Sequence, residues 1–188
     1  MDTTPHPRHD GDGGQEHTEV EVVLLGGPPD WHGRTLSMPA SAAVRESAGA
    51  HLISDHTPHR TMEEDTDPRA VYDPDPAPAP QRVWWFRGWL PASTTRMEWV
   101  RPSPADREPV EATLDGHGAP AAWTAPDGTR WAVDRLQVHW VYEGEGAAGG
   151  DVGVWQVRAH SSAEQAAVWE LVCDPAVGWA AARVPASG

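Results

Sequence analysis

Tryptophan is the residue that most limits what this chain can fold into. The 188 residues include eleven tryptophans but one phenylalanine, and Ile53 is the single isoleucine. Leucine, isoleucine, valine and phenylalanine together are scarce and the net charge is high, a combination typical of disordered chains. Each indole, however, offers a large apolar surface for burial. We therefore expect local order, with tryptophan and valine building the interior while proline, glycine and acidic residues fill the rest.

The chain is strongly acidic. It has 28 acidic residues against 14 basic ones, all of them arginine, and a formal net charge of -14. A negative field around the whole molecule opposes binding to nucleic acid or to an anionic membrane. The lack of lysine and the abundance of alanine, glycine and proline are typical of a GC-rich genome, so we expect an actinobacterial or phage source. A protein is the expected partner, nucleic acid is disfavoured, and no membrane is expected.

Neither a disulfide framework nor a targeting segment is expected. Cys173 is the single cysteine, so neither an intramolecular disulfide nor a cysteine-based zinc site is expected. It lies in an apolar alternating run, which predicts a buried thiol. Residues 1–16 have no apolar core, unlike a signal peptide, and no apolar stretch approaches the ~20 residues that span a bilayer. We expect a cytoplasmic location.

The N-terminal half predicts a tail followed by a small β unit over residues 17–101. Residues 1–16 are rich in glycine, proline and aspartate without periodicity, which predicts disorder. Apolar and acidic side chains alternate over residues 18–25, the pattern of a β-strand with one wet face. Residues 34–38 predict the return strand, so that the two form a hairpin with a long loop.

The rest of this half gives mixed signals. Residues 40–50 contain good helix formers and predict one short helix. Residues 55–81 are nearly all proline, aspartate, glutamate, threonine and alanine, which predicts a polyproline-like linker or surface loop unable to bury a core. The aromatic run at 82–89 predicts a strand, and residues 95–100 predict another.

The C-terminal part predicts an antiparallel β domain over residues 108–185. Short apolar runs alternate with a period of two and are separated by turn residues. One of these, Pro126-Asp127-Gly128, suits a type I turn followed by a left-handed glycine. About five or six such strands form a meander, and we expect it to curl into a small barrel or half-open roll, because a flat sheet that small cannot bury its apolar face. The proline-containing break at 101–104 is the expected boundary between the two β units.

Two stretches resemble sequences from actinobacteria. The first comprises GAPAAWTAPDGTRWAVDRLQVHWVY, VGVWQVRA and AVWELVCDPAVGWAAARV, within residues 108–185, and resembles a small tryptophan-rich actinobacterial domain of unknown function. The second is VVLLGGPPDWHGRTLSMP, which resembles a hairpin of short hypothetical proteins from actinobacteria and their phages. Both resemblances imply a small β fold, and neither implies an activity.

No motif in the chain predicts catalysis or a cofactor. Residues 26–29, Gly-Gly-Pro-Pro, follow a strand as a phosphate loop would, but the two prolines lack N–H donors and the motif's lysine is absent. A structural turn is therefore favoured. Polar side chains scattered over the C-terminal part match no catalytic motif; they include Asp115, His117, Asp134, His139 and His160.

Four potential metal ligands crowd one short stretch: His51, Asp55, His56 and His59. Imidazole and carboxylate groups at such spacing can bind zinc. The stretch is not a His-Glu-x-x-His helix, and no second shell of supporting residues can be identified. A solvated polar loop is favoured, and a metal-dependent enzyme using this loop is kept as an alternative.

The best functional candidates lie in the aromatic segment at residues 82–101, where Trp84, Trp85, Arg87 and Trp89 combine rings with a guanidinium. Such groups can stack on peptide side chains or on bases. These tryptophans could simply fill the core. Trp84 and Trp85, however, point to opposite faces of the strand, and if only one face is core the other tryptophan is exposed. We expect a non-enzymatic module that binds protein through an exposed Trp/Arg face, with a nucleic-acid-binding accessory protein as an alternative.

Overall fold

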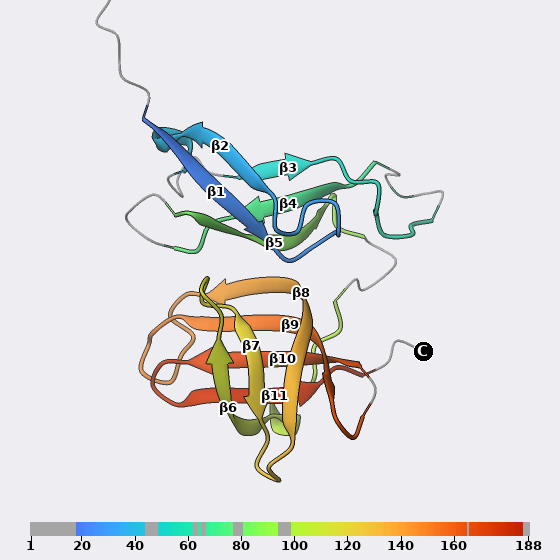
Figure 1. Ribbon diagram of the computed structural model, residues 1–188, viewed down its shortest axis with the longest axis vertical. Helices are drawn as coiled ribbons and strands as arrows, with labels where there is room; N and C mark the ends of the chain where they lie inside the picture. The colour runs from blue at the N-terminus through green and yellow to red at the C-terminus, as the bar shows by residue number, and fades with distance from the viewer. Residues whose placement is uncertain are drawn as a thin grey trace, which may run out of the picture.

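Two β-sheets make up the described part of the chain, an open five-stranded sheet and a closed six-stranded barrel (Figure 1). The computed structural model describes residues 18–43, 49–61, 64, 67–76, 81–93, 99–164 and 166–185. Among these residues there is no α-helix, and two short 3-10 helices occur, η1 (Ala40–Ala43) and η2 (Pro104–Asp106). The predicted mainly β fold is confirmed.

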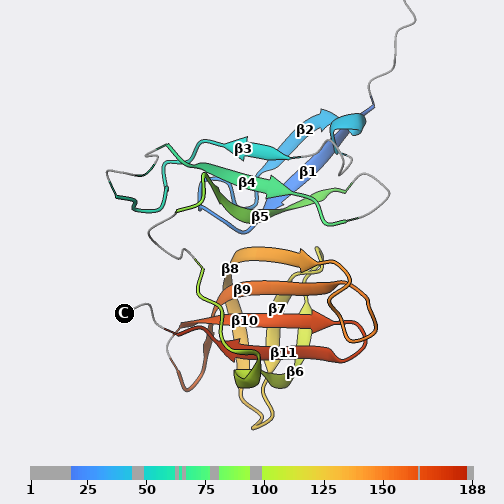
Figure 2. The same cartoon turned by 180° about the vertical axis from the view of Figure 1, so that it is seen from behind.

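The N-terminal sheet has the strand order β2-β1-β5-β4-β3. Its strands are β1 (Glu19–Leu25), β2 (Thr35–Pro39), β3 (Ala50–Leu52), β4 (Arg69–Asp73) and β5 (Val83–Leu90). β1 and β2 form the predicted antiparallel hairpin, and β1 buries Val22 and Leu24 while Glu19 and Glu21 are exposed. β5 pairs with β1 in parallel and with β4 in the antiparallel direction. The sheet curls, so that its two end strands, β2 and β3, both lie on the side away from the barrel (Figures 1 and 2).

Aromatic rings fill the inside of the curled sheet. The Phe86 ring packs edge to face on Trp89 and Trp99, with centroid separations of 5.6 and 6.2 Å. Tyr72 lies 5.5 Å from the same ring, and Trp84 belongs to the same cluster. Burying a side chain the size of phenylalanine stabilises a fold by about 2 kcal/mol. Rings therefore supply the core that leucine supplies in most proteins.

The prediction of a loop over residues 55–81 is wrong at β4, which is a strand. The run Ala70, Val71 and Tyr72 is buried, because β4 lies between β3 and β5 and both neighbours supply backbone partners. Pro68 and Pro74 flank the strand and do not interrupt it, which is where proline is tolerated. The composition of the whole segment concealed a strand only five residues long.

Other predictions for this half fall partly outside the described residues. The helix predicted over 40–50 is wrong at both described ends, because Ala40–Ala43 form a 3-10 helix and Ala50 begins β3; residues 44–48 are not described. The tail at 1–16 and most of the strand predicted at 95–100 also lie outside the described residues.

The C-terminal half forms a closed barrel with the order β10-β11-β6-β7-β8-β9. Its strands are β6 (Glu108–Leu114), β7 (Pro120–Thr124), β8 (Arg130–Tyr142), β9 (Val152–Ser161), β10 (Ala167–Asp174) and β11 (Gly178–Arg183). Consecutive strands pair in the antiparallel direction, and β11 closes the barrel on β6. The predicted meander that curls into a small barrel is confirmed. Gly128 adopts the predicted left-handed conformation, with φ of 84°, in the turn between β7 and β8.

Indoles fill the barrel. Trp123 and Trp131 stack with their planes 8° apart, and Trp169 lies 4.6 Å from Trp131 between ring centroids. Trp155 and Trp179 form a second contact at 5.0 Å. Cys173, predicted to be buried, is half-buried beside this cluster, and burial raises the pKa of its thiol.

A connector at residues 99–107 leads from the sheet to the barrel and crosses β9, β10 and β11 on the outside (Figure 2). The Glu170 carboxylate, fully buried beneath it, pairs with Arg101 at 2.9 Å and Arg107 at 2.7 Å. Gln156 Nε2 donates to the carbonyl oxygen of Val100 at 2.9 Å. These bonds hold the connector against the barrel wall.

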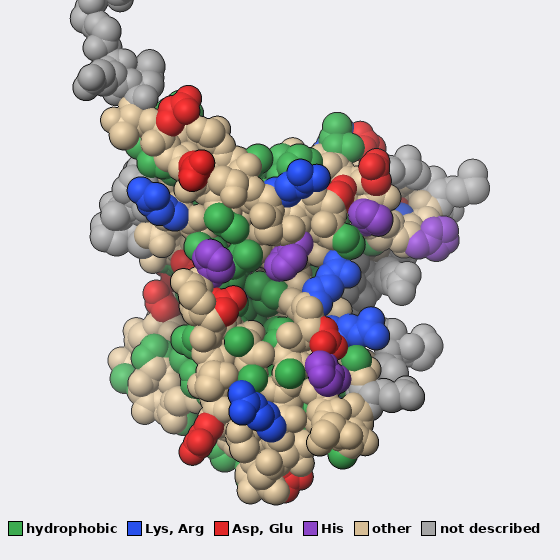
Figure 3. All heavy atoms as spheres, in the orientation of Figure 1, with side chains coloured by type: hydrophobic (Ala, Val, Ile, Leu, Met, Phe, Trp, Pro, Cys, Tyr) green, Lys and Arg blue, Asp and Glu red, His purple; other side chains and the backbone are tan. Residues whose placement is uncertain are grey.

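The turn after β1 joins the sheet to the barrel. Gly26 N–H donates to His32 Nδ1 at 2.9 Å, and Gly27 N–H donates to the carbonyl oxygen of Gln137 on β8 at 2.7 Å. Arg135 Nη2 donates to the carbonyl oxygen of Gly27 at 2.7 Å. The N–H groups that a phosphate would need are thus used internally, which supports the predicted structural turn. On the face seen in Figure 3, hydrophobic side chains line a hollow where the two sheets meet.

Candidate binding site

The three tryptophans of the predicted site are buried. Trp84, Trp85 and Trp89 are 2%, 5% and 9% exposed. Trp84 and Trp89 belong to the core of the curled sheet, whereas Trp85 joins the barrel cluster. The expectation that one of these tryptophans faces outward is therefore wrong. One face of β5 packs on the core of the curled sheet, and the other face packs on the barrel.

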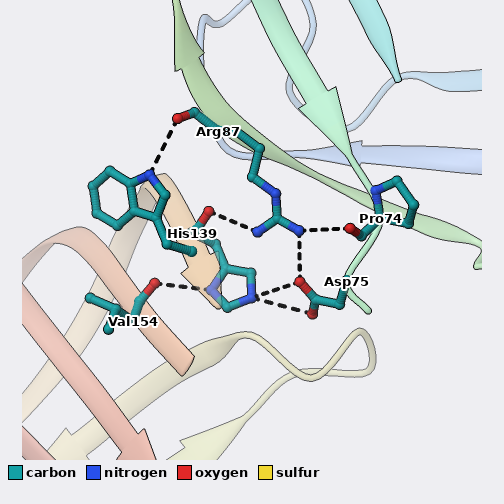
Figure 4. A network of polar contacts seen from close by, with 6 residues as sticks. Pro74, Asp75, Arg87, His139 and Val154 are labelled. Carbon is teal, nitrogen blue, oxygen red and sulfur yellow. Dashed lines mark hydrogen bonds and ion pairs between the residues drawn. The ribbon is translucent and has the colours of Figure 1, made fainter. Parts of the chain in front are cut away.

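Arg87 is the predicted site residue that reaches a surface pocket. Its guanidinium donates from Nη1 to the carbonyl oxygen of His139 at 2.9 Å. Nη2 donates to the carbonyl oxygen of Pro74 at 2.9 Å and forms an ion pair with Asp75 at 2.7 Å (Figure 4). Arg87 therefore links β5, the segment after β4, and β8.

His139 is the buried centre of this network. Its Nδ1 lies 3.0 Å from the carbonyl oxygen of Val154, and its Nε2 lies 3.1 Å from Asp75 Oδ1 (Figure 4). Both ring nitrogens of His139 therefore lie within hydrogen-bond distance of an oxygen atom. The ring stacks on Trp155 at 4.3 Å and meets Trp85 edge-on at 4.8 Å. These two tryptophans and the two oxygen partners fix the orientation of the imidazole.

The Asp75 carboxyl has a pKa below its ordinary value. Burial acts to raise this pKa, but the hydrogen bonds and positive charges of His139 and Arg87 lower it by more. The folded protein therefore favours the ionised carboxylate. This group contributes stability at any pH above its ordinary pKa of 3.8, and the contribution is lost as the pH falls through the lowered value.

Asp75→Asn is expected to reduce stability at neutral pH and to flatten the acid dependence of stability. The neutral amide cannot form the ion pair with Arg87, whereas the wild-type carboxylate loses that ion pair only on protonation. Urea denaturation followed by tryptophan fluorescence, at several pH values from neutral to about pH 3, measures the difference in unfolding free energy. We expect that difference to shrink below about pH 4. A difference independent of pH would contradict the assignment.

The network supports one wall of a pocket of about 400 Å³, which we name the junction pocket. It is lined by Asp73, Pro74, Pro76, Arg87, Trp140, Val141 and Tyr142. Trp140 and Tyr142 project from the same strand, β8. Trp140 Nε1 donates to the carbonyl oxygen of Arg87 at 3.3 Å, and Tyr142 Oη accepts from Arg101 Nη1 at 2.9 Å. The aromatic side chains of the pocket are thus held in place.

The junction pocket offers aromatic and charged side chains to a ligand. The lining residues that the structure describes include no serine, threonine or cysteine. His139 lies behind the pocket and uses both ring nitrogens in the network, so neither is free to act as a general base. Neither His139 nor Asp75 was predicted as a site residue, because a lone histidine in a strand and an aspartate 64 positions away carry no shared signal in the sequence.

The two alternatives gain no support from the described residues. His51, Asp55, His56 and His59 are all described, yet the described residues contain no group of three or more histidine, cysteine, aspartate or glutamate side chains placed to hold a metal ion. For nucleic-acid binding, two of the arginines in the aromatic segment already have acidic partners, Arg87 with Asp75 and Arg101 with Glu170.

Comparison with family models, with curated proteins and with solved structures gives no match for this chain. The resemblances noted in the sequence therefore stay predictions. Over the residues that the structure describes, no helix has the length and apolar character needed to cross a membrane.

Proposed function

We propose that the protein is a non-enzymatic interaction module that binds another protein at the junction pocket. The observation that carries this proposal is a preformed surface pocket in which Trp140, Tyr142 and Arg87 lie together. Tryptophan, tyrosine and arginine are the residue types that most often dominate the energy of protein interfaces. The proposal keeps Arg87 from the site expected in the sequence and uses Trp140 of β8 in place of the buried tryptophans of β5.

The rigidity of the pocket supports the proposal. Arg87 is held by three acceptors, on Pro74, Asp75 and His139. Trp140 is held by its hydrogen bond to the backbone of Arg87 and by an edge-to-face contact with Trp99 at 6.1 Å. Side chains fixed before binding lose less conformational entropy when a partner arrives, so a small pocket of this kind gains affinity.

Tyr142→Ala is expected to weaken peptide binding at least about tenfold, because it removes one aromatic wall of the pocket. A phage-displayed library of short random peptides is panned on the full chain, and the affinity of the enriched peptide is measured by calorimetry. Leu114→Ala is the matched control, since Leu114 is an exposed apolar residue on β6 and is not among the pocket's lining residues. Equal affinities for the two variants, or no enriched peptide, would refute the proposal.

A further inference from the structure

The curled sheet has an open seam between β2 and β3. Its five strands end at β2 and β3, and both lie on the side away from the barrel (Figures 1 and 2). Within the described residues, β2 pairs only with β1 and β3 only with β4. The C-terminal barrel, by contrast, closes with six strands. The seam is the place where one more strand could be added to the N-terminal sheet.

The edge of β2 is suited to such an addition. Leu24 N–H donates to the carbonyl oxygen of Arg34. Continuing the antiparallel alternation from there directs the backbone groups of Thr35 and Ser37 away from β1. Soluble proteins usually protect an edge strand with charged residues or an internal proline. β2 is Thr-Leu-Ser-Met-Pro and β3 is Ala-His-Leu, so neither has a Lys, Arg, Asp or Glu, and the only proline ends β2.

A pocket of about 420 Å³ lies at one end of the seam, and we name it the seam pocket. It is lined by Asp30, Trp31, Arg34, Thr35, Leu36, Ile53 and Asp55. Trp31 Nε1 donates to the carbonyl oxygen of Ile53 at 2.7 Å, and Ser54 Oγ donates to Asp30 Oδ1 at 2.8 Å. These bonds connect the β1–β2 turn to the segment after β3. The pocket therefore has walls from both sides of the seam and a fixed shape.

The seam pocket combines apolar and acidic groups. Ile53 is 65% exposed, and among the large apolar residues that the structure describes only Val177 is more exposed. Trp31 and Leu36, which line the same pocket, are half-buried. Asp30 and Asp55 outnumber Arg34 on the lining. Glu19 and Glu21 on neighbouring β1 are exposed. A second copy of this chain would carry the same net charge of -14 and be repelled, so a positively charged occupant fits better.

We propose that the seam between β2 and β3 binds an extended, positively charged segment of another protein by strand addition to β2, with an apolar side chain of that segment in the seam pocket. Backbone hydrogen bonds to Thr35 and Ser37 would supply affinity, and the pocket with its acidic rim would supply specificity. This surface is separate from the junction pocket, since the two share none of their described lining residues.

Three synthetic peptides test the proposal on the full chain. The first alternates valine and lysine, the second alternates valine and glutamate, and the third is the first with N-methyl groups on alternate amides. We expect the lysine peptide to bind and the glutamate peptide not to bind. N-methylation on the pairing edge should weaken binding at least about tenfold, because it removes the strand's donors. Binding that is unchanged by N-methylation or by the sign of the charge overturns the proposal.

Two matched variants locate the binding. Ile53→Ala is expected to weaken the lysine peptide about fivefold or more, because it removes exposed apolar surface from the pocket. Val177→Ala is the control, since Val177 is 76% exposed in the turn between β10 and β11. Tyr142→Ala should leave this peptide's affinity unchanged, which separates failure here from failure at the junction pocket. Equal effects of Ile53→Ala and Val177→Ala on the peptide's affinity overturn the proposal. A concentration-dependent dimer of the wild-type chain that Ile53→Arg abolishes also overturns it, because the seam would then bind a second copy.

Discussion

Gly27→Ala is expected to lower the free energy of unfolding by about 2 to 5 kcal/mol. Gly27 has φ of 71°, a conformation that costs an alanine about 1 to 2 kcal/mol. A Cβ at this position would lie 2.6 Å from Phe86 Cγ and 2.6 Å from Tyr72 Oη. Both rings are buried, so the added methyl overpacks the core and costs about 1 to 3 kcal/mol more. Urea denaturation followed by tryptophan fluorescence measures the loss.

Gly33→Ala is the matched control for this prediction. Gly33 lies in the same turn region with φ of 78°, but no atom comes within 4 Å of the position that its Cβ would take. Only the conformational cost of about 1 to 2 kcal/mol is then expected. Equal losses for the two variants would show that close packing at Gly27 contributes nothing. Gly27→Ala, unlike Gly33→Ala, is also expected to weaken the contact between sheet and barrel. The backbone of Gly27 forms hydrogen bonds with Gln137 and Arg135, which both lie on β8.

The sequence reveals strands wherever the alternation is local and regular. The alternating valines and glutamates of β1 predict a strand with one solvent-exposed face. The turn residues between β6 and β11 predict a small curled meander. Both predictions rest on patterns that lie within a few neighbouring residues. Barrel closure depends on β11 meeting β6, and these strands are far apart in the chain. β4 was missed because three buried residues, Ala70 to Tyr72, stand in a segment whose composition is that of a loop.

The candidate site was only partly predictable for a related reason. Arg87 was identified, but the burial of Trp85 depends on a second sheet that packs on the far face of β5, and no local pattern reports that. The same holds for Trp140 and Tyr142, which looked like ordinary alternating residues of a long strand. Their place in a pocket follows from the approach of Pro74, which follows β4, and of Arg87 on β5.

Glu170→Ala is expected to lower the free energy of unfolding by about 3 kcal/mol. Glu170 is completely buried and forms ion pairs with Arg101 and Arg107, whose side chains are 39% and 19% exposed. Removing the carboxylate leaves two guanidinium groups without their buried partner. Their partial exposure lets water replace some of the lost interaction, which places the effect near the lower end of the range for a broken buried ion pair. Chemical denaturation at neutral pH measures this loss.

The loss of Glu170 is also expected to free the connector from the barrel wall. Trypsin cleaves after arginine, and the bond after Arg107 should be cut faster in Glu170→Ala than in the wild type under native conditions, because the segment is no longer tied down. Glu164→Ala is the matched control, since Glu164 pairs with Arg183 at 3.5 Å on the surface, with both side chains more than half exposed. Such a pair contributes less than about 1 kcal/mol. Equal stability losses and equal cleavage rates for the two variants would mean that the buried carboxylate does not hold the connector, and that other contacts, such as those of Gln156 and Tyr142, keep it on the barrel.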